Sequence, residues 1–462
     1  MEGHSILRGL RVFVVNCGPV PQLETCALHP LQTLRLDPVQ RPDAMTTLFV
    51  NASAVVTAAG PGRARRGREM ADAGVRTKVG VAVGADGKVL AVGPDAELRS
   101  EHRGAALVDC ARGVLTPGFV DSHTHAIFGR PRHEEQELRA AGVGYLEIAK
   151  RGGGIHSSVR DLRTRSEDEL VALAAPRLRR LAAHGTTTIE VKSGYGLSVE
   201  AELRTLRVLR RLAAELPIRL VPTFLGAHEV PLEYREAPRT RAEYIDLLVH
   251  EMIPAVARDG LARFCDIFCE PGVYTVAESR RVLSAARDAG LALKLHADEL
   301  ENGAAAELAA EMAATSADHL AAISPAGIAA LASVGTVATL LPGTMLFLGR
   351  SKQAPARALI EAGCAVALAS DFNPGTSPTV NFPLVLTLGV SQLRLSVSEA
   401  FVAATVNGAA ALGLAGETGQ IAPGFAADLA LFDVSDHREI PYWYGDRRCV
   451  ATWVGGREAH RG

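Results

Sequence analysis

Two histidines one residue apart, His123 and His125, stand at the end of an apolar stretch that is typical of a β-strand. Side chains at positions i and i+2 of a strand point to the same face, so both imidazoles can reach one point beyond the strand end. Neutral imidazoles that converge in this way suit zinc or ferrous iron. The pair predicts a metal site if other segments supply the remaining ligands, and otherwise a strand end without a ligand.

Other short apolar runs also end in groups that can bind a metal or transfer a proton. The chain has only fourteen histidines, and five of them fall at such strand ends. This concentration favours one shared site over unrelated packing or capping roles. The groups concerned are His123, His125, His228, His296, Glu299, His319 and Asp371.

A one-metal hydrolytic site follows from this set. A bound metal lowers the pKa of water toward ~7 and so provides a hydroxide nucleophile at neutral pH. Glu299, three residues after His296, can shuttle a proton to the leaving group. Asp371 together with His319 can do the same, and the sequence leaves this alternative open. The expected ligands, which leave one position for water, are His123, His125, His296 and Asp371.

A two-metal site is disfavoured because it usually needs a bridging ligand, often a carboxylated lysine on the fourth strand of a barrel. The fourth strand expected here, residues 262–268, has no lysine, and Lys192 lies at the end of the second strand instead. Zinc and iron both accept three histidines and an aspartate, so the identity of the metal stays open.

The elements that position these residues repeat one pattern from about residue 114 onward: a short β-branched run, a polar loop and a long amphipathic helix. Eight such units predict an α/β fold, the (β/α)8 barrel, whose functional residues lie at the C-terminal ends of the strands. A doubly wound open sheet is the alternative, but no glycine-rich phosphate loop follows the first strand. The expected strands are 115–123, 186–192, 219–225, 262–268, 292–296, 316–319, 336–341 and 365–370, and the helices include 167–183, 199–216, 242–259, 276–289 and 355–362.

Both flanks of the barrel show short strands separated by turns. Residues 85–88 predict a hairpin turn, and strand patterning returns in 424–433 and 449–454. We therefore expect one small β-sandwich from 46–113 and 415–462 around a barrel domain at 114–414. Residues 1–45 hold five prolines and no clear periodicity, which predicts a disordered extension or a start site assigned too far upstream.

Composition is that of an ordinary globular protein, with 48% hydrophobic and 22% charged residues. A net charge of −2 does not indicate nucleic acid or a membrane surface as a partner, and no apolar run reaches the length of a membrane span. The seven cysteines are scattered and odd in number, which disfavours a disulfide scaffold and fits a reducing cytoplasm.

These features resemble the amidohydrolase superfamily of metal-dependent hydrolases, which pairs a barrel with a β-sandwich and carries the pattern Pro-Gly-x-x-Asp-x-His-x-His, found here at residues 117–125. Within it, the chain is similar to the imidazolonepropionase family. The motifs that carry this likeness are Phe-Gly-Arg-Pro-Arg at 128–132, Gly-Gly-Gly-Ile at 152–155, Glu-Val-Lys-Ser-Gly-Tyr-Gly at 190–196, Gly-Ala-His-Glu at 226–229 and Asp-Phe-Asn-Pro-Gly-Thr at 371–376.

The resemblance implies hydrolysis of the ring amide of 4-imidazolone-5-propanoate to N-formimidoyl-L-glutamate, a step of histidine degradation, by a metal-bound hydroxide. It implies one zinc or iron ion per subunit on the four ligands above, and a homodimer. Arg132 offers a guanidinium fork that matches the propanoate carboxylate, and His228 can hydrogen-bond the ring carbonyl. The residues that the resemblance places around the substrate are Arg132, Tyr195, His228, Glu299, Asn373, Gly375 and Thr376.

Two other functions are open to a chain of this kind. A one-metal deaminase of a purine or pyrimidine base would share the metal ligands, but a neutral base would not need a cation such as Arg132. A non-catalytic assembly protein on the same fold would be marked by lost ligands, and all four are present.

Overall fold

The computed structural model describes residues 45–143, 147–148, 152–235 and 237–462, which belong to one compact unit. Residues 1–44, for which the sequence predicts a disordered extension or a misassigned start, lie outside the described part. Among the described residues, no helix has the length and apolar character that crossing a membrane requires.

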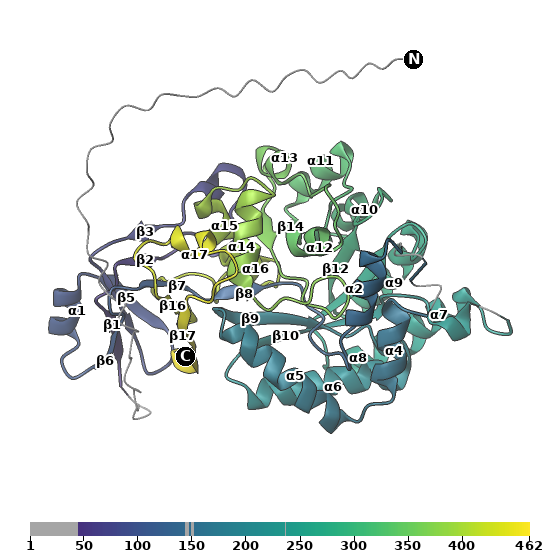
Figure 1. Cartoon of the computed structure of the whole chain (residues 1–462), viewed down its shortest axis with the longest axis horizontal. Helices are drawn as coiled ribbons and strands as arrows, with labels where there is room; N and C mark the ends of the chain where they lie inside the picture. Colours follow the sequence, from purple (N-terminus) through teal and green to yellow (C-terminus); the bar gives the residue numbers. More distant parts are fainter. Residues whose placement is uncertain (1–44, 144–146, 149–151, 236) are drawn as a thin grey trace, which may run out of the picture. The chain divides into compact units, whose positions relative to one another are not determined.

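Eight parallel strands form the central sheet, and each pairs with the next one along the chain. Strand order that follows chain order excludes the doubly wound alternative, in which the order reverses partway through the sheet. The predicted barrel is therefore confirmed. Its strands are β8 (Phe119–Asp121), β9 (Thr186–Lys192), β10 (Arg219–Ala227), β11 (Phe264–Cys269), β12 (Ala292–Ala297), β13 (Ser316–His319), β14 (Val337–Leu340) and β15 (Val366–Leu368). Figure 1 shows helices α5 (Glu167–Ala182) and α6 (Val199–Glu215) beside strands β9 and β10.

The first barrel strand differs from the prediction of one strand at 115–123. The chain forms two strands there, β7 (Val114–Pro117) and β8, and β7 belongs to a flanking sheet. They separate at Gly118, where a Cβ atom would lie 2.1 Å from Thr187 Oγ1. Only glycine permits this approach to β9, so one continuous apolar run serves two sheets.

The barrel closes through the residues that follow β8 and β15. The His125 amide donates to the Phe372 carbonyl at 2.8 Å, and the Asp371 amide donates to the His123 carbonyl at 3.0 Å. One step below, the buried Asp121 carboxylate accepts hydrogen bonds from the amide and the hydroxyl of Ser370. Candidate metal ligands thus form part of the backbone seam that joins the first and last strands.

Helices connect the strands, and several begin at a serine or threonine that bonds to the third residue of the helix while a glutamate there bonds back. The helix expected at 242–259 is interrupted by a π-helical turn, η3 (Leu248–Met252). The helices are α2 (His133–Ala140), α4 (Ile155–Arg163), α5 (Glu167–Ala182), α6 (Val199–Glu215), α7 (Arg241–Leu247), α8 (Ile253–Arg258), α9 (Val276–Asp288), α10 (Ala305–Glu311), α11 (Pro325–Val334), α12 (Pro342–Phe347), α13 (Ala356–Glu361), α14 (Phe382–Ser391), α15 (Val397–Ala404) and α16 (Val406–Ala410).

Two flanking sheets combine both ends of the described chain. One has the order β5-β4-β1-β6 and the other β18-β17-β16-β7-β2-β3, and the rings of Phe49 and Trp453 meet between them at 4.9 Å. The predicted hairpin is confirmed by the antiparallel pair β4 and β5. The expected domain limits stay a prediction. The strands are β1 (Thr47–Val50), β2 (Ala54–Val56), β3 (Val75–Arg76), β4 (Gly80–Val83), β5 (Val89–Gly93), β6 (Ala106–Asp109), β7, β16 (Leu429–Phe432), β17 (Cys449–Val454) and β18 (Arg457–Arg461), with short helices η1 (Gly67–Ala71), α1 (Asp95–Glu101), η2 (Leu232–Tyr234) and α17 (Glu439–Tyr442).

The seam yields a stability prediction. Asp121→Ala should lower the free energy of unfolding by about 1–3 kcal/mol, because it leaves the buried Ser370 amide without an acceptor. Asp121→Asn keeps an oxygen for that amide and should lose less. Urea-induced unfolding measures both, and an alanine variant as stable as the wild type would contradict this role of Asp121.

Candidate active site

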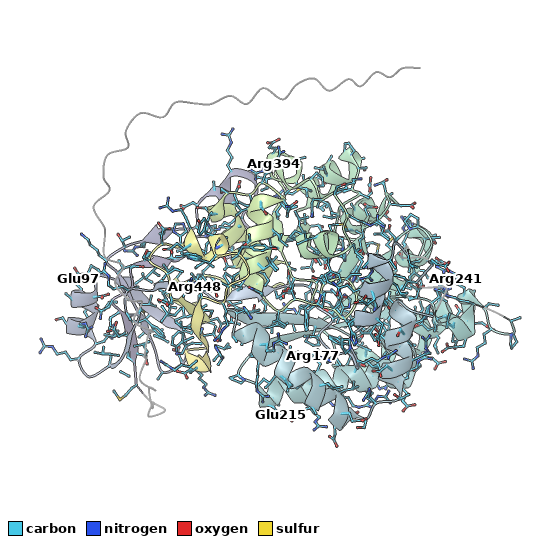
Figure 2. All side chains as sticks on the ribbon, viewed as in Figure 1. Glu97, Arg177, Glu215, Arg241, Arg394 and Arg448 are labelled. Carbon is cyan, nitrogen blue, oxygen red and sulfur yellow. The ribbon has the colours of Figure 1, made fainter. Side chains whose placement is uncertain are left out.

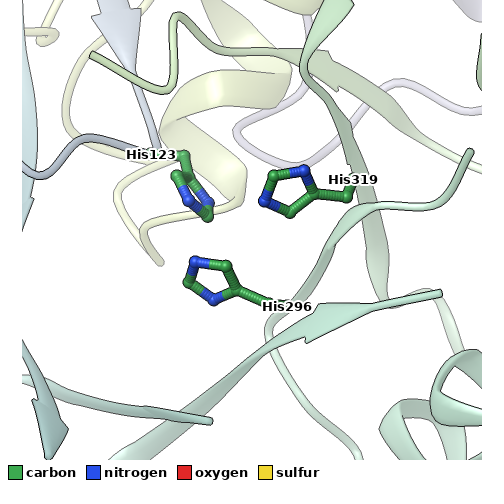
Figure 3. A group of neighbouring side chains, drawn as sticks. All are labelled: His123, His296 and His319. Atoms are coloured by element: carbon green, nitrogen blue, oxygen red, sulfur yellow. The ribbon is translucent and has the colours of Figure 1, made fainter. Parts of the chain in front are cut away.

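Five of the predicted groups come together at the C-terminal end of the barrel. His125 Nε2 lies 3.5 Å from His296 Nε2, and Asp371 Oδ1 lies 3.6 Å from His123 Nε2 and 3.5 Å from His125 Nε2. His319 joins from the end of β13, and Figure 3 shows its ring turned toward those of His123 and His296. All five side chains are buried.

Carboxylates on other strands of the barrel orient two of these imidazoles. His123 Nδ1 lies 2.7 Å from Asp318 Oδ2, and His296 Nδ1 lies 3.0 Å from Asp266 Oδ2. An imidazole that donates from Nδ1 keeps the lone pair of Nε2 for a metal. The sequence did not predict Asp266 as a site residue, because it lies within an apolar strand and not at the strand end. The alternation of β11, which turns Asp266 to the same side as Phe264, was the available signal.

The histidines suit a divalent cation. Burial first, and then neighbouring cationic groups, hold the pKa values of His123, His125 and His319 well below the ordinary value, so these rings are neutral as metal ligands must be. Burial also raises the pKa of Asp371 to about 6, although a 2.6 Å hydrogen bond from Thr344 opposes the rise. Within the described residues, the buried Nε2 atom of His123 has no hydrogen-bond partner, which a cation would provide.

Lys192 lies beneath this group and is fully buried. Its Nζ atom is 2.6 Å from Glu190 Oε1 and 2.7 Å from Asp266 Oδ2. These pairs raise the lysine pKa against the opposing effect of burial, so Lys192 is an ammonium ion. An ammonium held by two carboxylates is not available as a bridging ligand, which agrees with the expectation of one metal.

Glu299 faces His319, with 3.6 Å between Oε2 and Nε2. Burial raises the Glu299 pKa well above its usual value, and the nearby charges of Asp371 and Glu270 add to the rise. Glu270, which the sequence did not suggest, accepts the backbone N–H groups of Glu299 and its two successors at 2.9, 3.0 and 2.7 Å. Glu299 thus lies on a loop fixed by a second carboxylate, in surroundings that favour its protonated form.

Tyr195 and His228 line the same site. The His228 ring stacks on His125 at 4.9 Å and lies 5.4 Å from the Tyr195 ring. His228 Nδ1 is 3.0 Å from the Gly194 carbonyl, which can only accept, so Nδ1 carries the proton. Burial lowers the His228 pKa to about 3, so Nε2 is unprotonated. In this tautomer the free nitrogen is an acceptor, so the expected donation from His228 to a ring carbonyl, which stays a prediction, would need a ring protonated on both nitrogens.

The Tyr195 loop is held by Glu202, another carboxylate that sequence reasoning missed. Its oxygens accept the amides of Gly194, Gly196 and Leu197 at distances of 2.7–3.0 Å. A glutamate at the fourth position of a predicted helix gave no signal of this role, because the loop that folds back onto it is irregular.

Arg132 is buried directly above Gly375, where a Cβ atom would lie 1.6 Å from its Nη2 atom. Its Nε atom is 3.2 Å from Glu135 Oε1. Across the described residues, no other carboxylate contacts the guanidinium within 4 Å. Glycine at position 375 is thus required for Arg132 to occupy this place, and its charge is only partly compensated.

The turn formed by Asn373, Gly375 and Thr376 is closed by hydrogen bonds within the segment itself. Asn373 Oδ1 accepts the amides of Gly375 and Thr376 at 2.8 and 2.7 Å, and Asn373 Nδ2 donates to the Asp371 carbonyl. These residues stay predicted ligand contacts. Their observed task is to shape the chain between Asp371 and the glycine beneath Arg132.

The loop that leads from β8 to Arg132 is anchored by Arg177, which Figure 2 labels on α5. Its guanidinium lies 3.6 Å from the centre of the Phe128 ring, and Nη2 donates to the Gly129 carbonyl at 2.7 Å. The ring contact accounts for Phe128, whereas glycine at position 129 is explained by Asp161, whose Oδ2 atom would lie 1.5 Å from a Cβ atom there.

Comparisons of the sequence identify its relatives. The profile described as the amidohydrolase family matches residues 139–460. A protein of Symbiobacterium thermophilum named imidazolonepropionase is 49% identical over 402 residues, which cover 86% of this chain and 93% of that protein. A protein of Solibacter usitatus with the same name is 43% identical over 414 residues, which cover 89% of this chain and 98% of the relative.

Solved structures with the same fold include E. coli guanine deaminase, with a TM-score of 0.69, 16% identity and coverage of 90% of this chain and 99% of that one. An adenosine deaminase of Xanthomonas campestris has a TM-score of 0.66 at 18% identity, over 89% and 92% of the two chains. At such identities the likeness shows the fold alone. From the sequence relatives, the chain belongs to the amidohydrolase family and, within it, to the imidazolonepropionases.

Proposed function

We propose that this protein hydrolyses 4-imidazolone-5-propanoate to N-formimidoyl-L-glutamate. The observation that carries the proposal is the 49% identity, over most of both chains, to a relative named imidazolonepropionase. Two features of the site support it. One is a group of buried side chains that could hold a metal ion. The other is the buried guanidinium of Arg132, which is close enough to lower the pKa of His228. Water adds to the ring carbonyl, and the carbon–nitrogen bond breaks to leave a carboxylate and a formimidoyl group.

The metal ligands in this proposal are His123, His125, His296 and Asp371, whose distances were given above. A bound zinc or iron ion would supply Lewis acidity toward the ring carbonyl and the attacking water. Three histidines and one aspartate suit either metal. A homodimer is proposed from the family resemblance alone. A cytoplasmic location is supported by the five described cysteines, which are all free thiols.

Side chains of the protein bind the substrate and transfer protons in this proposal. Arg132 binds the propanoate carboxylate and so fixes the position of the substrate ring in the site. His228 accepts a hydrogen bond from a ring N–H through Nε2, because Nδ1 is engaged with Gly194. Tyr195 packs against the planar ring. Asp371 takes the proton of the attacking water, and Glu299, whose pKa is raised by burial, delivers a proton to the leaving nitrogen beside His319.

Deamination of a purine or pyrimidine base is the second candidate. Its support is the fold shared with guanine and adenosine deaminases, which carries no information on substrate at 16–18% identity. A neutral base would offer no anionic group to Arg132, whose charge Glu135 compensates only in part. Hydrolysis of the anionic substrate therefore explains a feature that deamination does not.

Turnover tests the proposal directly. The purified protein should consume imidazolone propionate, followed by the loss of its ultraviolet absorbance, and should release no ammonia from cytosine, guanine or adenine. Ammonia from one of these bases, with imidazolone propionate left intact, would replace the proposed function by the second candidate.

Arg132→Ala should raise KM for the propanoate substrate with a much smaller change in kcat. A hydrogen bond to a charged group contributes about 1.5–3 kcal/mol, which corresponds to a rise of roughly 10- to 100-fold in KM. The effect falls on KM because the carboxylate is bound alike in the ground and transition states. Arg130→Ala is the matched control, since it removes the same charge from an exposed position two residues away. Equal KM values for the two variants would rule out the carboxylate role of Arg132.

A further inference from the structure

A single buried ammonium, that of Lys192, is connected to the segments of all three candidate histidine ligands. Its ion pair with Asp266 at 2.7 Å reaches His296, because the same Oδ2 atom lies 3.0 Å from His296 Nδ1. Asp266 Oδ1 also accepts the His296 amide at 3.1 Å. Both the ring and the backbone of this ligand are therefore tied to a carboxylate that Lys192 holds.

Two further connections lead to the first strand. Lys192 lies 2.6 Å from Glu190, whose Oε2 atom accepts the amide of Thr124, the residue between His123 and His125, at 3.2 Å. Lys192 is also 3.8 Å from Asp318 Oδ2, the atom that meets His123 Nδ1. Every side chain in these connections is fully buried, so water does not compete for the contacts.

We propose that Lys192 is a positioning residue, which holds Glu190, Asp266 and Asp318 in the arrangement that directs the Nε2 atoms of the histidines at one metal ion. The inference rests on the proposed metal site and deepens it. It assigns the alignment of ligands from the first and fifth strands of the barrel to Lys192, which reaches them through three carboxylates.

The direction in which metal affinity changes when Lys192 is replaced can test this assignment. A positive charge beneath a cation site repels the cation, so its removal should tighten metal binding if charge alone mattered. Alignment has the opposite effect, because Asp266 without its ammonium partner is free to turn away from His296. The direction in which metal affinity changes therefore separates the two roles.

The test measures the zinc dissociation constant of the full-length protein by competition with a chromophoric chelator, together with the thermal unfolding of the metal-free form. Lys192→Met should weaken zinc binding by about 10- to 100-fold, the usual effect of losing a partner of a metal ligand. Unchanged or tighter zinc binding would overturn the inference. A wild-type protein that binds no zinc or iron would instead refute the proposed metal site itself.

A double variant separates positioning from simple stabilisation. Glu190→Gln/Lys192→Met removes both charges of one ion pair, and the glutamine oxygen can still accept the Thr124 amide. It should recover much of the thermal stability that Lys192→Met loses. It should still bind zinc weakly, because Asp266 has lost its ammonium partner. Full recovery of zinc affinity in the double variant would show that Lys192 only compensates Glu190, and would overturn the inference.

Lys294→Met is the matched control for loss of a buried ammonium. Lys294 is equally buried on β12 and bonds Ser316 Oγ at 2.7 Å. It lies 3.5 Å from Asp318 Oδ2, nearer than Lys192 at 3.8 Å, so its loss affects the link to His123 through Asp318 as well. It leaves the Lys192–Asp266 pair intact, so its effect on zinc binding should be several-fold smaller. Equal weakening in both lysine variants would contradict a specific role for Lys192.

Discussion

The hydrogen bonds that join the segment after β8 to the segment after β15 are the constraint on which the site depends. They use the backbone of His123, His125 and Asp371, so closing the barrel and assembling three of the four proposed metal ligands are one event. Two residues of the site, one in the seam and one at the end of β13, have unusual backbone conformations. Asp371 has a φ of 52° and His319 a φ of 79°, conformations that cost energy in residues other than glycine and that the closed barrel holds in place.

Buried carboxylates outnumber buried ammonium groups beneath the site. With each group at full charge, Glu190, Asp266, Asp318 and Asp371 exceed the ammonium groups of Lys192 and Lys294, and Asp121 in the seam is a further buried acid. Buried charge without compensation is costly, so this excess favours binding of a cation. Asp266 and Asp318 also orient the imidazoles of His296 and His123. The same residues therefore supply negative charge for a cation and fix the geometry of its ligands.

Sequence patterns predicted the parts of this structure that depend on local periodicity. The alternation of strands and helices predicted the barrel, and the strand ends then placed His123, His296 and Asp371 at one rim. Contacts between distant segments had no such signal. The separation of β7 from β8 at Gly118 depends on the side chain of Thr187, and the proton on His228 Nδ1 depends on a carbonyl at Gly194. Carboxylates such as Glu202 and Glu270 act by accepting backbone amides of irregular loops, which periodicity does not describe.

The most direct test of the account is X-ray diffraction from crystals of the protein, with data collected on both sides of the zinc and iron absorption edges. The account predicts one anomalous peak per chain, about 2.0–2.2 Å from Nε2 of His123, His125 and His296 and from Oδ1 of Asp371. Two peaks would contradict it, as would a single peak bound by His319 in place of Asp371 or no peak in crystals grown with either metal.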